Sequence, residues 1–361
     1  MGSAILAYPA MKKIQEAYPS AQLYFWIFKK NQDGVWALDI IPHKNVIVMR
    51  SESLMLLCID IFKNLRRIHK EKMDVVIDME LFTRFTSFLT YLSRAATRVG
   101  FHAGRFWGPY RGGLHTHSVI YNPRIHISRN FLSLVDAVIN DNKKDAAFLK
   151  SRALDYPLAI AQRKPTQEER DRIWKKIKQL NPRITIHNTL VLVNPGINDV
   201  LSVRRWPIEN YIGLAKNILE DENIFIALVG TAAQSFYGEK ISGGIVSSRI
   251  VNLIGETSVE ELLALCDISK LLISHDSGLV HLASLTKIHI IVLFGPETPA
   301  LYAPLTSEKT VCYAALSCSP CISAYNHRRA VCKDNKCLRA IAVEEVVSVA
   351  KKVLYNISLL S

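Results

Sequence analysis

Short apolar runs alternate along the chain with stretches whose apolar residues recur at helical spacing. In the first half, the pattern predicts strands at 22–28, 45–49, 74–79 and 97–101 and helices at 7–17, 53–69 and 81–93. In the second half, it predicts strands at 190–196, 224–230, 251–255 and 288–296 and helices at 208–219, 259–266 and 343–354. This alternation is typical of an α/β protein built on parallel sheets.

The chain has the length and the internal break expected of two such domains. Its 361 residues are more than a single core usually needs. A polar stretch at 162–169, which contains Pro165, precedes a charged helical pattern and is the expected linker. We therefore predict an N-terminal domain over residues 1–165 and a C-terminal domain over residues 166–361.

The charge balance predicts an anionic partner. Lysine and arginine total 45 and aspartate and glutamate 32, which gives a net charge of +13, and this charge suits nucleic acid, a membrane surface or a phosphorylated substrate. The basic residues are dispersed and carry no nucleic-acid recognition signature, which argues against nucleic acid. No apolar run reaches the ~20 residues of a membrane span, and no secretory signal precedes the fold. We expect a cytoplasmic protein, with peripheral contact with anionic lipid as a further expectation.

The segment 273–296 is predicted to form a strand, a tight turn, a helix and a second strand. Asp276, Ser277 and Gly278 stand where the first strand meets the helix, and free backbone N–H groups at such a point favour phosphate. The second strand ends at Gly295, at the edge where α/β proteins bind ligands. The pattern predicts a site for a diphosphate-bearing ligand. The alternative is an ordinary connection in which Asp276 caps the helix and His281 is a core histidine.

Other predicted strands end at the same edge of the sheet. Asn194 and Gly196 end one of them and Gly230 ends the next. Arg204 and Arg205 follow the first of these strands, and an arginine offers phosphate a planar fork of donors. The alternative for these arginines is a solvated pair beside a packed tryptophan.

Four of the seven cysteines gather in the segment 317–338: Cys318, Cys321, Cys332 and Cys337. Four thiols at this spacing can converge on one tetrahedral ion, and the spacing is similar to that of structural zinc or iron sites. The alternatives are a pair of disulfides and four free thiols. We expect a structural zinc or iron ion at this cluster.

Several motifs together resemble glycosyltransferase family 9, the bacterial lipopolysaccharide heptosyltransferases. The sequence Asp-Ser-Gly-Leu-Val-His-Leu-Ala-Ser from position 276 is followed by Val-Leu-Phe-Gly-Pro-Glu-Thr-Pro from position 292. Upstream, Asn194-Pro-Gly196, Arg204-Arg-Trp-Pro207 and Arg98-Val-Gly-Phe101 resemble further motifs of the family. The order and the spacing of these motifs cover nearly the whole chain.

The resemblance implies a fold and a chemistry. It implies the GT-B architecture, in which two Rossmann-like domains face a cleft, with the acceptor on the N-terminal side and the nucleotide sugar on the C-terminal side. It implies that Asp276 contacts the sugar. The chain has no Asp-x-Asp pair, which fits the metal-independent catalysis of this class. The cysteine segment resembles that of the autotransporter-heptosyltransferase branch, which binds iron.

The catalytic base is the point at which the sequence departs from the family. Family members carry a Gly-Asp pair before a helix that resembles residues 4–10, after a first strand that is missing here, and the aspartate is the presumed base. This chain has Gly2-Ser3 instead, and a serine hydroxyl is a poor general base. Asp78 and Glu80, at the end of a predicted strand, are the expected substitutes. Their alternative is helix capping or an ion pair with Arg84 or Arg94.

These observations predict an inverting glycosyltransferase that moves heptose from ADP-heptose to a lipopolysaccharide-core or related acceptor, without a catalytic metal. One alternative is a catalytically silent protein that binds nucleotide sugar or serves in assembly, since Ser3 replaces the expected aspartate. Another is a nucleotide-sugar 2-epimerase on the same fold. A homo-oligomer is a further expectation.

Overall fold

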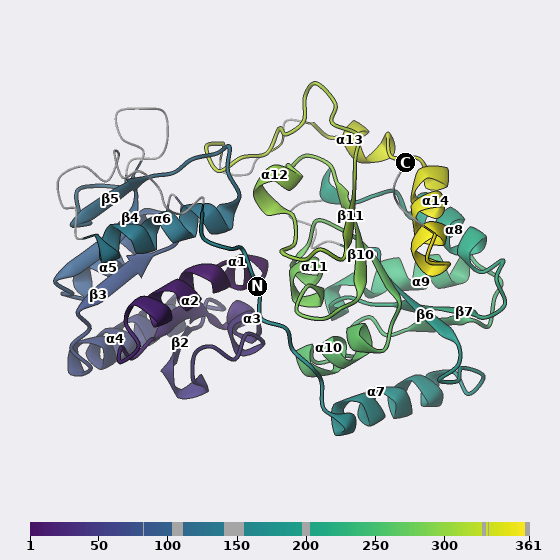
Figure 1. Cartoon of the computed structure of the whole chain (residues 1–361), viewed down its shortest axis with the longest axis horizontal. Helices are drawn as coiled ribbons and strands as arrows, with labels where there is room; N and C mark the ends of the chain where they lie inside the picture. Colours follow the sequence, from purple (N-terminus) through teal and green to yellow (C-terminus); the bar gives the residue numbers. More distant parts are fainter. Residues whose placement is uncertain are drawn as a thin grey trace. The chain divides into compact units, whose positions relative to one another are not determined.

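The computed structural model describes residues 1–81, 83–102, 111–140, 155–196, 203–326, 330 and 332–357 (Figure 1). The chain divides into two compact units. The first comprises Met1, Ser3–Ala159 and Ser323–Arg328, and the second comprises Gly2, Ile160–Ile322 and Arg329–Ser361. The division falls at 159/160 rather than at the 165/166 of the sequence analysis. Residues 160–164 join the second unit because the Arg163 N–H donates to the Leu285 carbonyl at 2.7 Å.

The first unit contains two small parallel sheets. Strand β1 (Phe25–Phe28) pairs with β2 (Val46–Met49), and a second sheet has the order β3 (Val75–Asp78), β4 (Thr97–His102) and β5 (His117–Ile120). Its helices are α1 (Gly2–Leu6), α2 (Tyr8–Ala17), α3 (Gln32–Trp36), α4 (Leu54–Lys70), α5 (Arg84–Leu92) and α6 (Ile127–Ile139). Short 3-10 turns lie at Lys29–Asn31 and His43–Asn45. The expected strand and helix alternation is confirmed here; β1, β2 and β3 are shorter than predicted, and β4 is one residue longer.

The second unit is built on one six-stranded parallel sheet with the order β11-β10-β9-β6-β7-β8. The strands are β6 (Thr189–Asn194), β7 (Ile224–Leu228), β8 (Ile250–Asn252), β9 (Leu271–His275), β10 (His289–Phe294) and β11 (Lys309–Tyr313). The helices are α7 (Gln167–Leu180), α8 (Ile208–Ile218), α9 (Ser235–Gly243), α10 (Val259–Asp267), α11 (Gly278–Ala283), α12 (Pro299–Tyr302), α13 (Lys336–Arg339) and α14 (Val343–Leu354), with a 3-10 turn at Ala232–Gln234.

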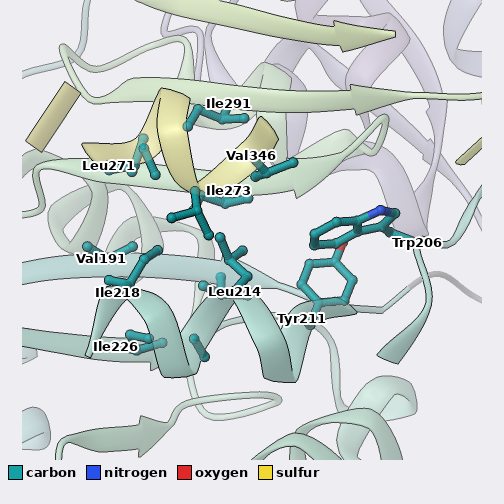
Figure 2. Close-up of a cluster of buried hydrophobic side chains, with 14 of the residues drawn as sticks. Val191, Trp206, Tyr211, Leu214, Ile218, Ile226, Leu271, Ile273, Ile291 and Val346 are labelled. Carbon is teal, nitrogen blue, oxygen red and sulfur yellow. The ribbon is translucent and has the colours of Figure 1, made fainter. Parts of the chain in front are cut away.

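Buried apolar side chains fix the sheet of the second unit against its helices. Figure 2 shows residues of β6, β7, β9 and β10 packed against α8 and Val346 of α14. Trp206 and Tyr211 are fully buried and meet edge to face, with ring centroids 5.1 Å apart. The indole N–H of Trp206 donates to the Ile341 carbonyl at 3.0 Å. This packing holds the residues that precede α8, including the two arginines, close to the strand ends.

Local signals set the starts of several helices. Thr166 and Glu169 form a reciprocal capping box on α7, and Ser258 and Glu261 form another on α10. Ser53 caps α4 by accepting from the Leu56 N–H at 3.2 Å. Among the described residues, no helix has both the length and the apolar composition that crossing a bilayer requires.

Candidate functional site

The turn between β9 and α11 has the predicted arrangement of strand, turn and helix. Asp276 and Ser277 connect the strand to α11, and Ser277 is the N-cap residue, without a side-chain capping bond. Asp276 is therefore not the cap of this helix. Its backbone N–H instead donates to the Leu293 carbonyl of the neighbouring strand β10 at 3.1 Å. Ser277 and Gly278 are partly exposed, and the Ser277 hydroxyl lies 3.3 Å from the buried Ser274 hydroxyl.

Arg204 lies between two carboxylates at this edge. One guanidinium nitrogen is 3.5 Å from Asp276 Oδ2, and another donates to Glu297 Oε1 at 2.6 Å. Asp276 follows β9 and Glu297 follows β10, and these strands pair directly. The side chains are mostly buried, with 13% of Arg204, 10% of Asp276 and 2% of Glu297 exposed. The two acids fix the guanidinium at the strand edge and balance its charge, while its Nε–H has no hydrogen-bond partner within the described part of the chain, which leaves one donor for a phosphate group.

Arg205 has a different environment from Arg204. Its guanidinium lies 4.2 Å from the centroid of the Tyr237 ring, a cation–π contact. Its carbonyl accepts from the Asn335 side-chain amide at 2.6 Å. The sequence left open which arginine serves the ligand, and the geometry favours Arg204, because it contacts the predicted sugar-binding residue Asp276.

A buried histidine supports the Arg204 position. His275, the last residue of β9, is fully buried, and its Nδ1 lies 3.5 Å from the Tyr211 hydroxyl. Burial, together with the smaller effect of the nearby positive charges of Arg204 and Arg205, lowers the pKa of His275 from 6.5 to about 3. The imidazole is neutral at physiological pH and adds no charge to the site.

The glycines at the ends of β6 and β7 serve packing. A Cβ on Gly230 would lie 2.2 Å from Gln234 Oε1, and one on Gly196 would lie 2.7 Å from Gln234 Cγ. Gln234 in turn accepts from the Thr231 N–H at 2.9 Å. Asn194 is buried and donates to the Val229 carbonyl at 2.8 Å, which ties β6 to β7. These residues lie at the predicted edge, and their contacts shape the loops around it.

Two other predicted donor-site residues are also engaged in packing. His281 is buried on α11, and its carbonyl accepts from the Ser284 hydroxyl at 2.6 Å. A Cβ on Gly295 would lie 2.6 Å from Leu338 Cγ, so this glycine gives room to the helix α13 that follows the cysteines. His281 is buried, and its part in the donor site stays a prediction.

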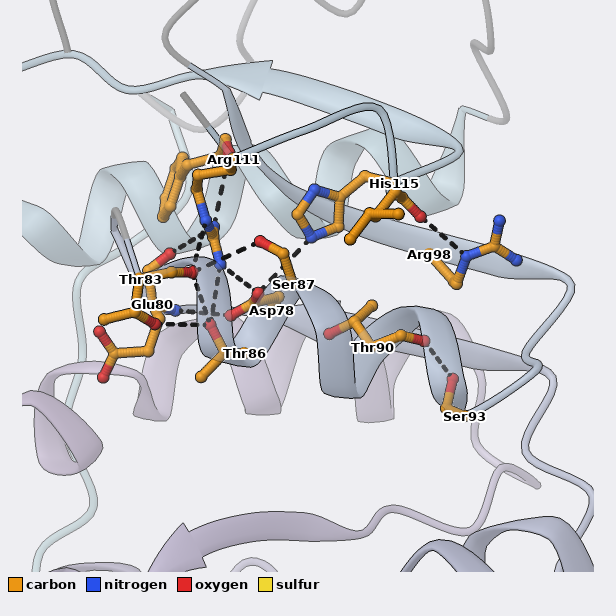
Figure 3. Close-up of polar contacts among 12 residues, drawn as sticks. Asp78, Glu80, Thr83, Thr86, Ser87, Thr90, Ser93, Arg98, Arg111 and His115 are labelled. Atoms are coloured by element: carbon orange, nitrogen blue, oxygen red, sulfur yellow. Dashed lines mark hydrogen bonds and ion pairs between the residues drawn. The ribbon is translucent and has the colours of Figure 1, made fainter. Parts of the chain in front are cut away.

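Asp78 ends β3 inside a closed network (Figure 3). Arg111 forms an ion pair with its carboxylate, and the two side chains are 0% and 3% exposed. His115 Nε2 lies 3.5 Å from the same carboxylate oxygen, and the Glu80 N–H donates to the other oxygen at 3.0 Å. The guanidinium also donates to the Glu80 carbonyl at 2.8 Å and to the Thr83 carbonyl at 3.1 Å.

This network has the ion pair named as the structural alternative for Asp78, with Arg111 in place of Arg84 or Arg94. A carboxylate that is buried and already bound by a guanidinium is a poor proton acceptor for a substrate. The Glu80 side chain is exposed. Ser3 lies in α1 and is exposed as well. Between the two predicted substitutes for the base, the geometry favours Glu80.

The Arg98-Val-Gly-Phe101 motif has a structural explanation. A Cβ on Gly100 would lie 2.3 Å from His115 Nε2, so glycine leaves the space that the imidazole fills. Arg98 donates to the Leu114 carbonyl at 3.0 Å and to the Ala95 carbonyl at 2.7 Å. The motif thus holds the segment that carries His115 beside Asp78.

The four cysteines line one small cavity of about 50 Å³ together with Val203 and Pro296. Burial raises the pKa of the Cys321 thiol, and the neighbouring thiols Cys318 and Cys332 raise it further. Burial likewise raises the pKa of Cys337. Within the described part of the chain, no three His, Cys, Asp or Glu side chains converge closely enough to hold an ion. The predicted clustering of the thiols is present, and the predicted ion-binding geometry is not formed. Arg328 and Arg329, which the sequence places near these thiols, lie outside the described residues.

The cysteine segment is bonded to both loops of the Arg204 site. The Cys321 N–H donates to the Pro296 carbonyl at 3.0 Å, next to Glu297. On the other side, the Asn335 amide donates to Arg205. Glu297 is the site residue that sequence reasoning missed, although the Gly-Pro-Glu turn at the end of a predicted strand contains it.

Comparisons with known proteins agree with this arrangement. A model of glycosyltransferase family 9 (heptosyltransferase) matches residues 61–331. Lipooligosaccharide heptosyltransferase 2 of Campylobacter jejuni is 29% identical over 189 residues, which are 50% of this chain and 56% of that protein. Lipopolysaccharide heptosyltransferase 2 of Salmonella typhimurium is 32% identical over 111 residues, which are 30% of this chain and 32% of that protein. The chain spans about half the length, or less, of these curated relatives.

Solved structures show the same fold. E. coli ADP-heptose LPS heptosyltransferase II matches with a TM-score of 0.75 and 17% identity, covering 98% of this chain and 96% of that one. E. coli heptosyltransferase WaaC with ADP matches with a TM-score of 0.66 and 15% identity over the same shares of the two chains. The parallel-sheet α/β architecture is that of the GT-B heptosyltransferases, as the sequence predicted. Because the family model matches most of its length, the chain belongs to glycosyltransferase family 9.

Proposed function

We propose that the protein is an inverting glycosyltransferase that moves heptose from ADP-heptose to a lipopolysaccharide-core or lipooligosaccharide-core acceptor. Family membership supports the reaction class, and the names of the relatives support the sugar and the acceptor. The observation that carries the proposal is Arg204, held by Asp276 and Glu297 where β9 and β10 end. The second unit then binds the donor, and the first unit binds the acceptor.

Departure of the diphosphate requires positive charge at the place where negative charge develops. Arg204 supplies a fixed cation, and the partly exposed Ser277 and Gly278 offer backbone N–H groups at the start of α11. Asp276 accepts a hydrogen bond from a sugar hydroxyl in this scheme. The sequence lacks the Asp-x-Asp pair that would recruit a metal ion to the diphosphate, so we propose that Arg204 provides the electrostatic stabilisation instead.

The acceptor hydroxyl must lose a proton as the new bond forms. We propose Glu80 as the general base, because its side chain is exposed at the end of β3, whereas Asp78 is bound by Arg111. A general base of this kind typically contributes about 10²–10⁴-fold to the rate. The unit that carries Glu80 would then hold the acceptor sugar.

The decisive experiment is a transfer assay with a heptose-accepting core oligosaccharide. We expect ADP release together with an acceptor mass increase of one heptose, and inverted anomeric configuration by NMR. ADP, UDP and GDP sugars are titrated in parallel by calorimetry to identify the nucleobase of the sugar donor. Gly278→Val should abolish donor binding while the fold stays intact, because a side chain would block the backbone approach.

The outcomes of this assay separate the candidate functions. Donor binding without any transfer would favour the catalytically silent protein. Conversion of a nucleotide sugar without an acceptor would favour an epimerase. Undiminished binding by the Gly278→Val variant would overturn the assignment of the donor site.

We further propose that Cys318, Cys321, Cys332 and Cys337 hold a structural zinc or iron ion. They line one cavity, and thiolates that raise each other's pKa are stabilised when a cation joins them. We expect about one ion per chain, lost in a Cys318→Ser/Cys321→Ser variant and retained in Cys58→Ser, whose thiol is exposed on α4. Metal-free protein with four titratable thiols would refute this site.

A further inference from the structure

The exposed face of α4 is apolar, which is the reverse of an ordinary surface helix. Leu54, Met55 and Phe62 are 76%, 69% and 65% exposed, and Ile59 between them is 50% exposed. These positions follow helical spacing and form one stripe. An apolar stripe of this kind normally faces a protein core, and here it faces away from one.

The buried side of α4 contains polar side chains. Asp60 is buried and pairs with Arg50, with 2.7 Å between Nη2 and Oδ1. Asn64 is buried and donates to the Val48 carbonyl of β2 at 2.9 Å. The helix is therefore fixed to the first unit by specific polar contacts, and these contacts hold its apolar residues outward. Rotating the helix to bury them would break both bonds.

Helix α5 repeats this inversion. Phe88 and Tyr91 are 53% and 51% exposed, and Phe85 is 37% exposed. The buried positions of α5 are Ser87, Leu89 and Thr90. Two helices with the same inverted pattern indicate a surface that is selected to be apolar, because scattered exposed apolar residues would not follow helical spacing twice.

The two helices meet at their C-terminal ends. A ring nitrogen of His69 on α4 lies 2.8 Å from the Leu92 carbonyl on α5, and both helices belong to the first unit (Figure 1). We define the α4/α5 face by its seven exposed apolar residues: Leu54, Met55, Ile59, Phe62, Phe85, Phe88 and Tyr91.

Positive charge accompanies this face. Lys63, Arg66 and Lys70 are exposed on α4, and the Arg66 guanidinium lies 5.6 Å from the centroid of the Phe62 ring. Arg84 begins α5 and Arg94 follows it. Asp60 is the sole acidic residue in the sequences of α4 and α5, and its charge is buried against Arg50. The face thus combines apolar and aromatic side chains with the exposed basic residues Lys63, Arg66 and Lys70.

We propose that the α4/α5 face docks the protein on an anionic lipid bilayer. Apolar and aromatic side chains bury themselves at the boundary between headgroups and acyl chains, and lysines and arginines bind the anionic headgroups. A second copy of the chain fits less well, because a twofold contact through this face would bring the basic residues of two copies into one interface without acidic partners on the face. The proposal rests on the proposed function only for its purpose, which is to bring the enzyme to a lipid-linked acceptor.

Vesicle co-sedimentation of the full chain tests this docking. We expect the protein to bind phosphatidylcholine vesicles that contain phosphatidylglycerol at least ~10-fold more tightly than vesicles of phosphatidylcholine alone, and to lose part of that binding in high salt. Phe62→Asp/Phe88→Asp should abolish binding, and Arg66→Gln/Lys70→Gln should weaken it on anionic vesicles. The matched control is Phe236→Asp, which charges a residue that is 56% exposed on α9 and should bind as the wild type does.

A second measurement separates insertion from surface adsorption. A tryptophan in place of Phe62 should shift its fluorescence to the blue when anionic vesicles are added, because its ring enters the apolar layer. Equal vesicle binding by the wild type and Phe62→Asp/Phe88→Asp would overturn the proposal. So would a dimer in light scattering that these substitutions dissociate, with no binding to vesicles.

The failure of this proposal can be distinguished from a failure of the proposed function. Donor titration and transfer to a water-soluble core oligosaccharide do not require a bilayer. A chain that transfers heptose in solution but ignores vesicles keeps the function and loses the docking face. A chain that binds vesicles but neither donor nor acceptor keeps the docking face and loses the proposed function.

Discussion

Two aspartate–arginine pairs at the ends of parallel strands have opposite surroundings. Asp78 at the end of β3 and Arg111 are 3% and 0% exposed, and the carboxylate is also contacted by His115 and by a backbone N–H. Asp276 after β9 and Arg204 are 10% and 13% exposed, and their closest atoms are 3.5 Å apart. The same residue types therefore form a fully enclosed pair in one unit and, in the other, a mostly buried pair beside the partly exposed Ser277 and Gly278, which we call the open pair.

The difference shows what separates a structural ion pair from a ligand site. Arg111 donates to three backbone carbonyls and to the Thr86 hydroxyl as well as to the carboxylate, so no donor remains for a ligand. Arg204 contacts two side-chain carboxylates next to partly exposed backbone at Ser277 and Gly278. An aspartate after a strand is thus weak evidence for a site by itself. Whether the arginine paired with that aspartate still has a hydrogen-bond donor for a ligand separates a binding site from a structural ion pair.

The largest expected effect comes from breaking the closed pair. Arg111→Met should lower the free energy of unfolding by about 3–5 kcal/mol, because it leaves the Asp78 carboxylate buried without its cation. Urea denaturation measures this loss. The double variant Asp78→Leu/Arg111→Met should be more stable than the single one, since neither charge then remains buried. A single variant as stable as the wild type would reopen Asp78 as a candidate base.

The next effect tests the base on the exposed side of the same network. Glu80→Gln keeps the size and the polarity of the side chain and removes its basicity, so turnover should fall at least ~100-fold with little change in donor affinity. Ser3→Ala, at the exposed residue of the otherwise largely buried α1, should leave turnover within about twofold. If Glu80→Gln stays active while Ser3→Asp raises the rate, the base belongs at the family's usual position instead.

The open pair is tested by a change that keeps its charge. Arg204→Lys leaves a cation but removes the planar fork that bridges Asp276 and Glu297, so donor affinity should fall roughly 10-fold. Arg205→Lys is the matched control, since its guanidinium lies over Tyr237. Calorimetry with ADP-heptose reads out both variants. Equal losses in the two would mean that general positive charge, and not the bridge, binds the donor.

Residues close in the sequence were predictable, and long-range partners were not. The turn at Asp276–Gly278 follows from an apolar run that ends in Asp-Ser-Gly, a local signal. Glu297 was not predicted as a partner of Arg204, because 93 positions separate them and nothing in a single sequence reports that contact. Arg111 was not predicted as the partner of Asp78 for the same reason, because 33 positions separate the two residues.

Short elements set the other limit of the sequence analysis. Strand β11, Lys309–Tyr313, was not predicted because five residues are too few for a clear periodic pattern, and its pairing with β10 is a tertiary contact that a single sequence does not report. The glycines of β6 and β7 were correctly placed at strand ends, but their role depends on Gln234, which packs against both. Tertiary packing, and not local propensity, decides these cases.

The smallest expected effect concerns the histidine behind the open pair. The pKa of His275 is about 3 in the folded chain, lowered by burial and by Arg204 and Arg205, against an ordinary 6.5. His275 therefore binds a proton below pH 6.5 in the unfolded chain, whereas in the folded chain it stays neutral until the pH approaches 3. This group costs nothing above pH 6.5 and destabilises the fold progressively as the pH falls from 6.5 toward 3. Between pH 7 and pH 5.5 it should remove about 1 kcal/mol of stability.

The test compares the pH dependence of two variants. His275→Asn places an oxygen near the position of Nδ1, which faces the Tyr211 hydroxyl, and removes the titration, so its free energy of unfolding should fall about 1 kcal/mol less than that of the wild type over the same pH range. His187→Asn, at an exposed histidine, should leave the wild-type slope unchanged. Identical slopes in all three proteins would mean that His275 accepts a proton while folded. The site beside Arg204 would then be more open to water than its burial indicates.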